Sequence, residues 1–354
     1  MPDAQPPIDK ATWTELVTAA SQLAALEPWK FATEGDVFGL TDPATGEVRL
    51  GHVLGDGSMV YAVVIYRKGG ISWLFSTLNG EGELSPQEAL ETMDCVKLEW
   101  VLKRDMEKED LAAISASGIK IPARGSVWPQ FRSSQPGWHP WHINAGEARQ
   151  LVSDLRQLIP MVRVFKVHPE LFDDRLSSDT PFLRADVFER EPGLGDLEWR
   201  SIVPPPEVPA GPVKVSESDL AQLKALRRAP NQSLDFDARL MPGAPLLKDG
   251  RPCLLRLGLA VETHTGLLAG FGVQEGDLPP GEAAASTLIA ILLNAKLLPA
   301  YLNVGNPKFK PAFQPLCTEL GIQLGLTDEM GAEDDSSFLD EAFDAMETGL
   351  MGGL

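Results

Sequence analysis

The sequence predicts an α+β / α/β protein with two domains, an antiparallel-sheet domain with helices followed by a mixed-sheet domain. The chain has 354 residues, and a single hydrophobic core usually stops growing at about 250–300 residues. The proline-rich run PPPEVPAGP at 204–212 resembles an extended linker, and all eight tryptophans precede it. We therefore expect a first domain over 1–203, a linker over 204–214 and a second domain over 215–354.

The first domain is expected to open with a helix over 11–26, whose apolar residues share one face. Two turn signals then divide three apolar runs, which predicts an antiparallel meander over 36–41, 47–54 and 59–66. By the same signals, further helices are expected at 69–78, 85–93, 106–118 and 145–158, and further strands at 96–102, 162–168, 182–190 and 197–203.

The stretch 127–144 is rich in proline and aromatic residues, and we expect it to form a loop. It holds three of the eight tryptophans and two of the five histidines. Tryptophan faces and nearby cationic or imidazole groups could hold a ligand ring, a peptide proline or a base. The candidate binding residues are Trp128, Arg132, Trp138, His139, Trp141 and His142. The alternative is a loop whose aromatics anchor it to the core. No further ligand completes a metal set beside the two histidines, so no metal site is predicted.

The second domain carries the most specific pattern. After a helix at 216–228, residues 252–326 follow the order strand, tight turn, strand, helix, strand, helix, strand. The segments AVETHTGLLAG, LLPAYLNVGN and FKPAFQPLCTELGIQL resemble the RNase H-like cores of integrases. That resemblance implies a mixed sheet and two Mg²⁺ ions held by carboxylates.

The acids that such chemistry needs are missing at the expected places. Glu262 is the only acid near the expected first strand, and Gly305, Asn306 and Pro307 follow AYLNV where an aspartate would be needed. We therefore expect a catalytically inactive core that serves as a scaffold. A generic α/β domain with the same order of elements is the alternative.

A hydrolase-type enzyme remains a second hypothesis. A histidine beside an acid can do acid–base work, so Glu262 and His264, with Asn306, are its candidate residues. Both Glu262 and His264 are also ordinary turn residues. No GxSxG, P-loop or HExxH motif is present, and no cofactor is expected.

The charge of the chain bears on its partners. The net charge is −19, and nine negative charges lie from Asp328 onward. Because phosphate backbones are bound by lysine and arginine, nucleic acid is an unfavourable partner; an unknown protein or a small molecule is expected instead. The apolar spacing of Phe338, Phe343 and Met346 predicts a C-terminal helix that packs on its own domain. The alternatives are a docking element or an acidic mimic of nucleic acid.

Cysteine usage and hydropathy indicate the compartment. Cys95, Cys253 and Cys317 are odd in number and far apart, so neither disulfides nor a zinc site is signalled. No run approaches the ~18 apolar residues of a membrane span. We expect a cytoplasmic protein without a membrane segment.

Several segments of the first half carry a family resemblance. WTELVTAASQLAALEPWKF, DVFGLTDPATGEV, W-P-x-F-R-S-x-x-P-G and P-W-x-I-x-A-x-E-A-R resemble an uncharacterised bacterial two-domain family of domains of unknown function. The resemblance implies the two-domain division and a bacterial cytoplasmic origin, and it brings no activity. The leading expectation is a non-enzymatic binding or interaction module.

Overall fold

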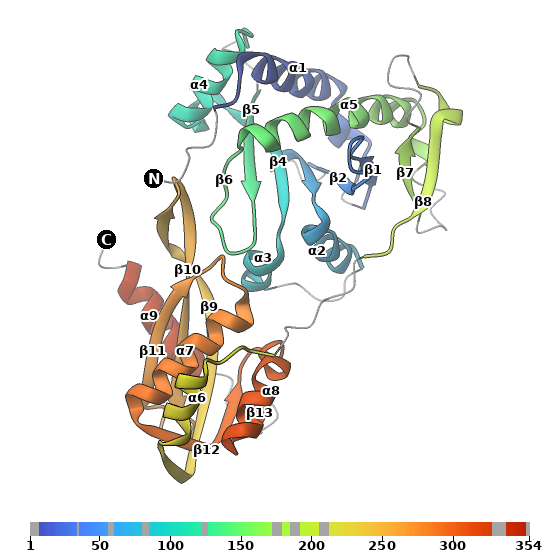
Figure 1. Cartoon of the computed structure of the whole chain (residues 1–354). Helices are drawn as coiled ribbons and strands as arrows, with labels where there is room; N and C mark the ends of the chain where they lie inside the picture. Colours follow the sequence, from blue (N-terminus) through green and yellow to red (C-terminus); the bar gives the residue numbers. More distant parts are fainter. Residues whose placement is uncertain are drawn as a thin grey trace. The chain divides into compact units, whose positions relative to one another are not determined.

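The computed structural model describes residues 7–33, 35–55, 60–79, 85–121, 127–171, 179–184, 192–204, 212–327 and 338–351. The chain divides into two compact units. Unit 1 comprises residues 1–135 and 140–206, and unit 2 comprises residues 136–139 and 207–354. Both units combine helices with a sheet (Figure 1), which confirms the predicted fold class. Most of the expected linker lies outside the described residues.

Unit 1 is built on an eight-stranded sheet in the order β6-β5-β4-β3-β2-β1-β7-β8. Neighbouring strands are antiparallel except β1 and β7, which are parallel. The predicted meander is confirmed as β1 to β3. The bounds are β1 Val37–Thr41, β2 Val48–Leu54, β3 Tyr61–Tyr66, β4 Cys95–Leu102, β5 Val127–Ser134, β6 Trp141–His142, β7 Asp179–Leu183 and β8 Leu197–Ser201.

Five α-helices accompany this sheet in the part of unit 1 that the structure describes. They are α1 Lys10–Leu26, α2 Lys68–Asn79, α3 Pro86–Thr92, α4 Lys108–Ser117 and α5 Ala145–Val167. Helix α5 crosses the strands and packs beside α1 (Figure 1). It begins with a capping box in which Asn144 accepts from the N–H of Glu147 and the Glu147 carboxylate accepts from the N–H of Asn144. Short 3-10 helices lie at Pro28–Lys30, Lys103–Asp105, Pro169–Leu171 and Leu194–Asp196.

Two expectations for unit 1 are wrong. The strand predicted at 162–168 is the last part of α5, in which Val162 and Phe165 are buried in the core. Burial of these side chains overrides the strand preference of β-branched residues and the break that Pro160 suggests. The stretch 127–144 is not one loop, because strands β5 and β6 pair within it.

Unit 2 contains a five-stranded sheet in the order β11-β10-β9-β12-β13. Strands β9, β10 and β11 are antiparallel neighbours, whereas β12 is parallel to both β9 and β13. The strand bounds are β9 Arg227–Lys248, β10 Arg251–Glu262, β11 Leu268–Glu275, β12 Leu297–Val304 and β13 Gln323–Leu326. The helices are α6 Glu217–Lys224, α7 Pro280–Ala295, α8 Phe309–Leu320 and α9 Phe338–Met351.

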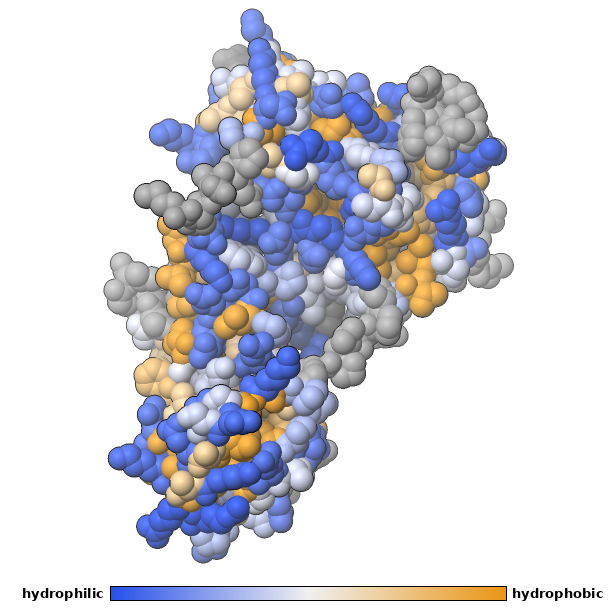
Figure 2. Space-filling view, in the orientation of Figure 1, coloured by the Kyte–Doolittle hydropathy of each residue, from blue (hydrophilic) through white to orange (hydrophobic). Residues whose placement is uncertain are grey.

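Strand β9 lies largely between the predicted helix at 216–228 and the predicted strand that begins at Pro252, where no element was expected. It forms a long hairpin with β10 across Asp249 and Gly250, which have positive φ angles of 52° and 78° and so suit a tight hairpin turn. Figure 2 shows apolar surface along this hairpin, where Leu246 and Leu247 are exposed. The first and central strand of the sheet is therefore β9, and β10 is the second.

The two faces of the unit 2 sheet bury different cores. Leu234 and Phe236 of β9 pack with apolar residues of α7 and α8. On the opposite face, Leu339 and Phe343 of α9 pack with Leu259 and other apolar residues of β9 and β10. Helix α9 thus packs on its own unit, as expected. None of the described helices is long and apolar enough to cross a membrane.

Candidate functional site

Two aspartates lie side by side on the central strand of unit 2. Asp235 and Asp237 are two positions apart on β9, so both side chains leave the same face of the sheet. They are only 6% and 5% exposed. Buried carboxylates need hydrogen-bond donors or a cation, because water no longer solvates them.

Neutral donors satisfy Asp235. The hydroxyl of Thr263 and the side-chain amide of Asn303 donate to its Oδ1 at 2.9 and 2.8 Å. Asn303 lies opposite Asp235 on β12, which places its amide beside the carboxylate. The arrangement joins the turn after β10 to the centre of the sheet.

A cation holds Asp237. The Nε of Arg239 donates to its Oδ2 at 2.8 Å, and the N–H of Ala238 donates to Oδ1 at 2.8 Å. The same guanidinium donates through Nη2 to Asp340 of α9 at 2.6 Å and lies 4.3 Å from the ring centre of Phe343. Burial alone would lower the pKa of Arg239, but its bonds to the two carboxylates raise that pKa. The guanidinium is therefore a fixed positive charge between two acids.

This acidic pair lies beside Gly305, one of the positions where the resemblance to integrase cores would require an aspartate. A Cβ atom on Gly305, just after β12, would come within 3.1 Å of the Asp237 carboxyl group. Two carboxylates and an amide oxygen are ligands that Mg²⁺ accepts. Here Arg239 binds the carboxylate of Asp237, which lies beside the end of β12.

Of the predicted catalytic residues, Glu262 and His264 lie in one turn after β10, whereas Asn306 follows β12. Glu262 accepts from the N–H groups of His264 and Thr265 at 3.1 and 2.8 Å, and from the Thr265 hydroxyl at 2.7 Å. These bonds lower the pKa of Glu262, and the bond from the Thr265 hydroxyl contributes most. Glu262 thus caps the turn. Asn306 accepts from the N–H of Lys308. Because β9 separates β10 from β12, about 10 Å of sheet divides their backbones.

Two of the predicted binding residues do meet. Arg132 and His142 pair across β5 and β6. Asp110 of α4 accepts from both terminal nitrogens of Arg132, at 2.7 and 2.8 Å, and Glu107 lies 3.1 Å from the same guanidinium. Glu107, Glu109 and His142 could together offer atoms to a metal ion, but Arg132 already binds the Glu107 carboxylate. The cluster therefore joins α4 to the sheet.

Of the other four predicted binding residues, Trp141 lies with this pair, whereas Trp128 is buried elsewhere in unit 1 and Trp138 and His139 belong to unit 2. Trp128 is buried against Val17 and Ile114 in unit 1. Trp138 and His139 belong to unit 2, where Trp138 bridges to Cys253 and the N–H of His139 donates to a carbonyl of β10. Trp141 lies beside His142, with 5.0 Å between ring centres. The six residues therefore do not form one surface within either unit.

A signal for the missed acids was present in the sequence. From Ser233 to Leu240 polar and apolar residues alternate strictly, which is typical of a strand with one apolar face. Asp235 and Asp237 fall on the polar positions of that pattern. Their burial was not visible, because helix α9, which covers this face, comes about 100 residues later.

Comparisons with known families agree with the division into two parts. Residues 13–183 match the family model described as a domain of unknown function (DUF7309). Residues 219–347 match a second one, a domain of unknown function (DUF6930). No curated protein matches the chain. The expected likeness to domains of unknown function is confirmed, and the aspartate pair lies inside the second matched region.

Proposed function

We propose that this chain is a non-enzymatic binding protein whose unit 2 is an RNase H-like scaffold with an arginine in place of a metal ion. The order β11-β10-β9-β12-β13 supports the fold assignment. So do the strand directions and the positions of α7 and α8 between β11, β12 and β13. RNase H-like domains share this order, and fold alone does not determine activity.

The observation that carries the proposal is the position of Arg239. A two-metal nuclease needs carboxylates that are open to Mg²⁺, which then holds the attacking and leaving oxygens. In this chain Arg239 donates hydrogen bonds to the carboxylates of Asp237 and Asp340. The side chains of Asn303 and Thr263 donate to Oδ1 of Asp235. A fixed guanidinium at this place repels a divalent cation and supplies no open coordination position.

The expected partner follows from the surface charge. With a net charge of −19, the chain repels polyanions unless a basic patch overcomes that field. A protein or small-molecule partner therefore suits this surface better than nucleic acid. Helix α9 is not a free acidic arm, because Leu339 and Phe343 are 1% and 4% exposed.

The proposal is tested by metal binding and by nuclease assays on the purified full chain. Mn²⁺ is titrated by calorimetry into the wild type and into Arg239→Gln, Arg239→Gln/Asp237→Asn and the surface control Arg149→Gln. We expect no Mn²⁺ binding by the wild type or by Arg149→Gln. Weak binding should appear in Arg239→Gln and disappear again in the double variant.

Cleavage is followed on single- and double-stranded DNA and RNA with Mg²⁺ or Mn²⁺. We expect none from the wild type. Metal-dependent cleavage by the wild type that Asp235→Asn abolishes would overturn the proposal, because it would show that the aspartate pair is an active metal centre.

A further inference from the structure

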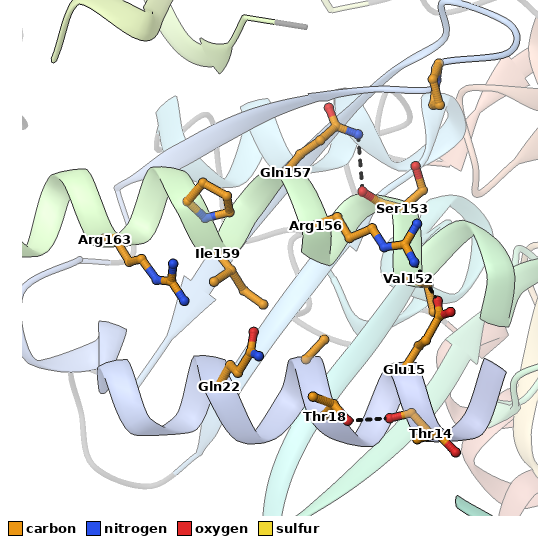
Figure 3. Close-up of a pocket in the computed structure, with 13 residues that line it drawn as sticks. Thr14, Glu15, Thr18, Gln22, Val152, Ser153, Arg156, Gln157, Ile159 and Arg163 are labelled. Carbon is orange, nitrogen blue, oxygen red and sulfur yellow. Dashed lines mark hydrogen bonds and ion pairs between the residues drawn. The ribbon is translucent and has the colours of Figure 1, made fainter. Parts of the chain in front are cut away.

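A groove of unit 1 lies between α1 and α5. It has a volume of about 610 Å³, within the range of roughly 300–1,000 Å³ that is usual for small-molecule sites. Figure 3 shows Arg156 and Arg163 projecting from α5, with Glu15 and Gln22 facing them from α1. None of these residues belongs to the acidic site of unit 2, so the groove is independent of the function proposed above.

The floor of the groove is apolar. Val152 and Ile159 line it and are otherwise buried in the core of unit 1, and Ala19 adds a small side chain from α1. Pro160 also lines it and brings no N–H to the carbonyl of Arg156. A ligand with an apolar body would bury that body against this floor.

The rim of the groove is cationic, although the chain is acidic. Two arginines and one glutamate line it, in a chain of net charge −19, and an anionic ligand at Arg163 would replace the present contacts of that side chain. Arg156 and Arg163 are seven residues apart, so they share one face of α5 at a rise of about 10.5 Å. Arg156 lies 2.9 Å from Glu15. Both partners are largely exposed, so this ion pair is weak and a stronger anion can displace it.

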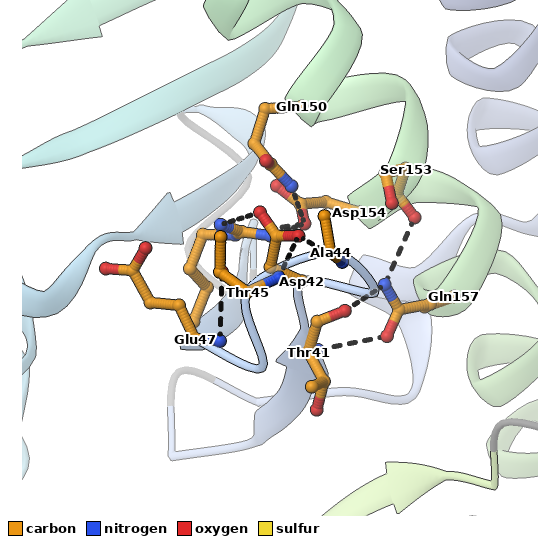
Figure 4. Close-up of polar contacts among 10 residues, drawn as sticks. Thr41, Asp42, Ala44, Thr45, Glu47, Gln150, Ser153, Asp154 and Gln157 are labelled. Carbon is orange, nitrogen blue, oxygen red and sulfur yellow. Dashed lines mark hydrogen bonds and ion pairs between the residues drawn. The ribbon is translucent and has the colours of Figure 1, made fainter.

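One wall of the groove, which includes Pro43 and Gln157, is fixed. Pro43 lies in the turn between β1 and β2, two residues after Thr41. The side-chain amide of Gln157 donates to the Thr41 carbonyl at 2.9 Å and accepts from its N–H at 3.0 Å. Figure 4 shows this exchange beside the bonds that Asp42 and Asp154 make. The wall is thus formed before a ligand binds, which reduces the ordering cost of binding.

We propose that the groove binds an elongated organic anion. Its carboxylate or phosphate would pair with Arg163 and Arg156, and its apolar chain would lie along Ile159 and Val152. Charge-assisted hydrogen bonds to a guanidinium suit both oxyanions. Carboxylate and phosphate ligands share this chemistry, and the probes below distinguish them.

The test uses the full chain and three probes with the same alkyl chain, which are octanoate, octyl phosphate and octan-1-ol. Below their micelle concentrations, each is titrated by calorimetry into the wild type and four variants. Arg156→Ala and Arg163→Ala remove the rim charges, and Ala19→Trp fills the groove. Arg149→Ala is the matched control, since Arg149 is exposed on the same helix and does not line the groove.

We expect saturable binding of at least one anion and at least tenfold weaker binding of octanol. Each rim variant should weaken anion binding by about tenfold or more, which is the usual size of a lost charge-assisted bond. Ala19→Trp should abolish binding, and Arg149→Ala should leave it unchanged. Preference for octanoate identifies a carboxylate ligand, and preference for octyl phosphate a phosphate ligand. The proposal is overturned if neither anion saturates, if octanol binds equally well, or if Arg149→Ala weakens binding as much as the rim variants.

Discussion

Arg49 of β2 and Asp154 of α5 form a buried ion pair, with Nε and Oδ1 3.1 Å apart and side chains 4% and 2% exposed. Asp42 lies 3.5 Å from the same guanidinium, and Gln150 donates to Asp154. Nη2 of Arg49 lies 3.1 Å from Asp154 but without hydrogen-bond geometry. Burial raises the pKa of Asp154 to about 6, and the nearby Arg49 only partly opposes that rise.

This pair predicts a pH-dependent stability. An acid whose pKa is higher in the folded than in the unfolded chain holds its proton more tightly when folded. Raising the pH from the unfolded value of 3.8 to the folded value of about 6 therefore favours unfolding. Relative to Asp154→Asn, the wild type should lose roughly 2 kcal/mol of unfolding free energy between pH ~4.5 and ~7.5. Urea unfolding of both proteins at both pH values measures this loss. If the difference in unfolding free energy between wild type and Asp154→Asn were the same at both pH values, the prediction would be wrong.

The pair of Asp110 and Arg132 predicts the opposite pH behaviour. Burial would raise the pKa of Asp110, but its bonds to Arg132 and its neighbours hold that pKa well below the ordinary value of 3.8. The stabilisation is therefore complete above pH ~4 and is lost as the pH falls through the folded pKa. We expect Asp110→Asn to cost about 3 kcal/mol at pH 7, because Arg132 loses the more buried of its two carboxylate partners. The control is Glu109→Gln at an exposed neighbouring position, which should change the unfolding free energy in urea very little.

Gly39 of β1 leaves no room for a larger residue. A Cβ atom there would overlap the ring of Phe182, its partner on β7. We expect Gly39→Ala to cost about 1–3 kcal/mol, as overpacking does. Gly51→Ala is the matched control, because the nearest atoms to a Cβ on Gly51 lie 3.5 Å away. In chemical unfolding, the double variant Gly39→Ala/Phe182→Leu should lose less unfolding free energy than the two single variants together. Strictly additive losses would contradict the overlap.

The docking of α9 depends on Phe343. This ring is 4% exposed and packs with Leu339 against β9 and β10. We expect Phe343→Ala to cost about 3 kcal/mol and to increase hydrogen exchange across α9. The exposed neighbour Asp344→Ala should leave the exchange unchanged. If neither variant altered it, α9 would not be held by this contact.

Local signals in the sequence were enough for many elements of the fold. Turn residues such as Gly46 separated the strands of the meander, and the apolar spacing of Phe338 and Phe343 indicated α9. The prediction failed where local preference and tertiary burial disagree. Residues 162–168 have the composition of a strand, yet Val162 and Phe165 complete the buried face of α5.

The candidate sites were less predictable, because their residues are far apart in the chain. Composition determined the net negative charge, and the alternation over Ser233 to Leu240 is typical of a strand with one polar face, although the structure buries both faces. Only the tertiary structure brought Arg239 to Asp340, which is 101 residues away, and Arg49 to Asp154, which is 105 residues away. A buried charge must find a partner wherever the fold supplies one. The sequence alone shows which residues carry charge, whereas the packing of α9 and α5 on their sheets decides which charges are buried and paired.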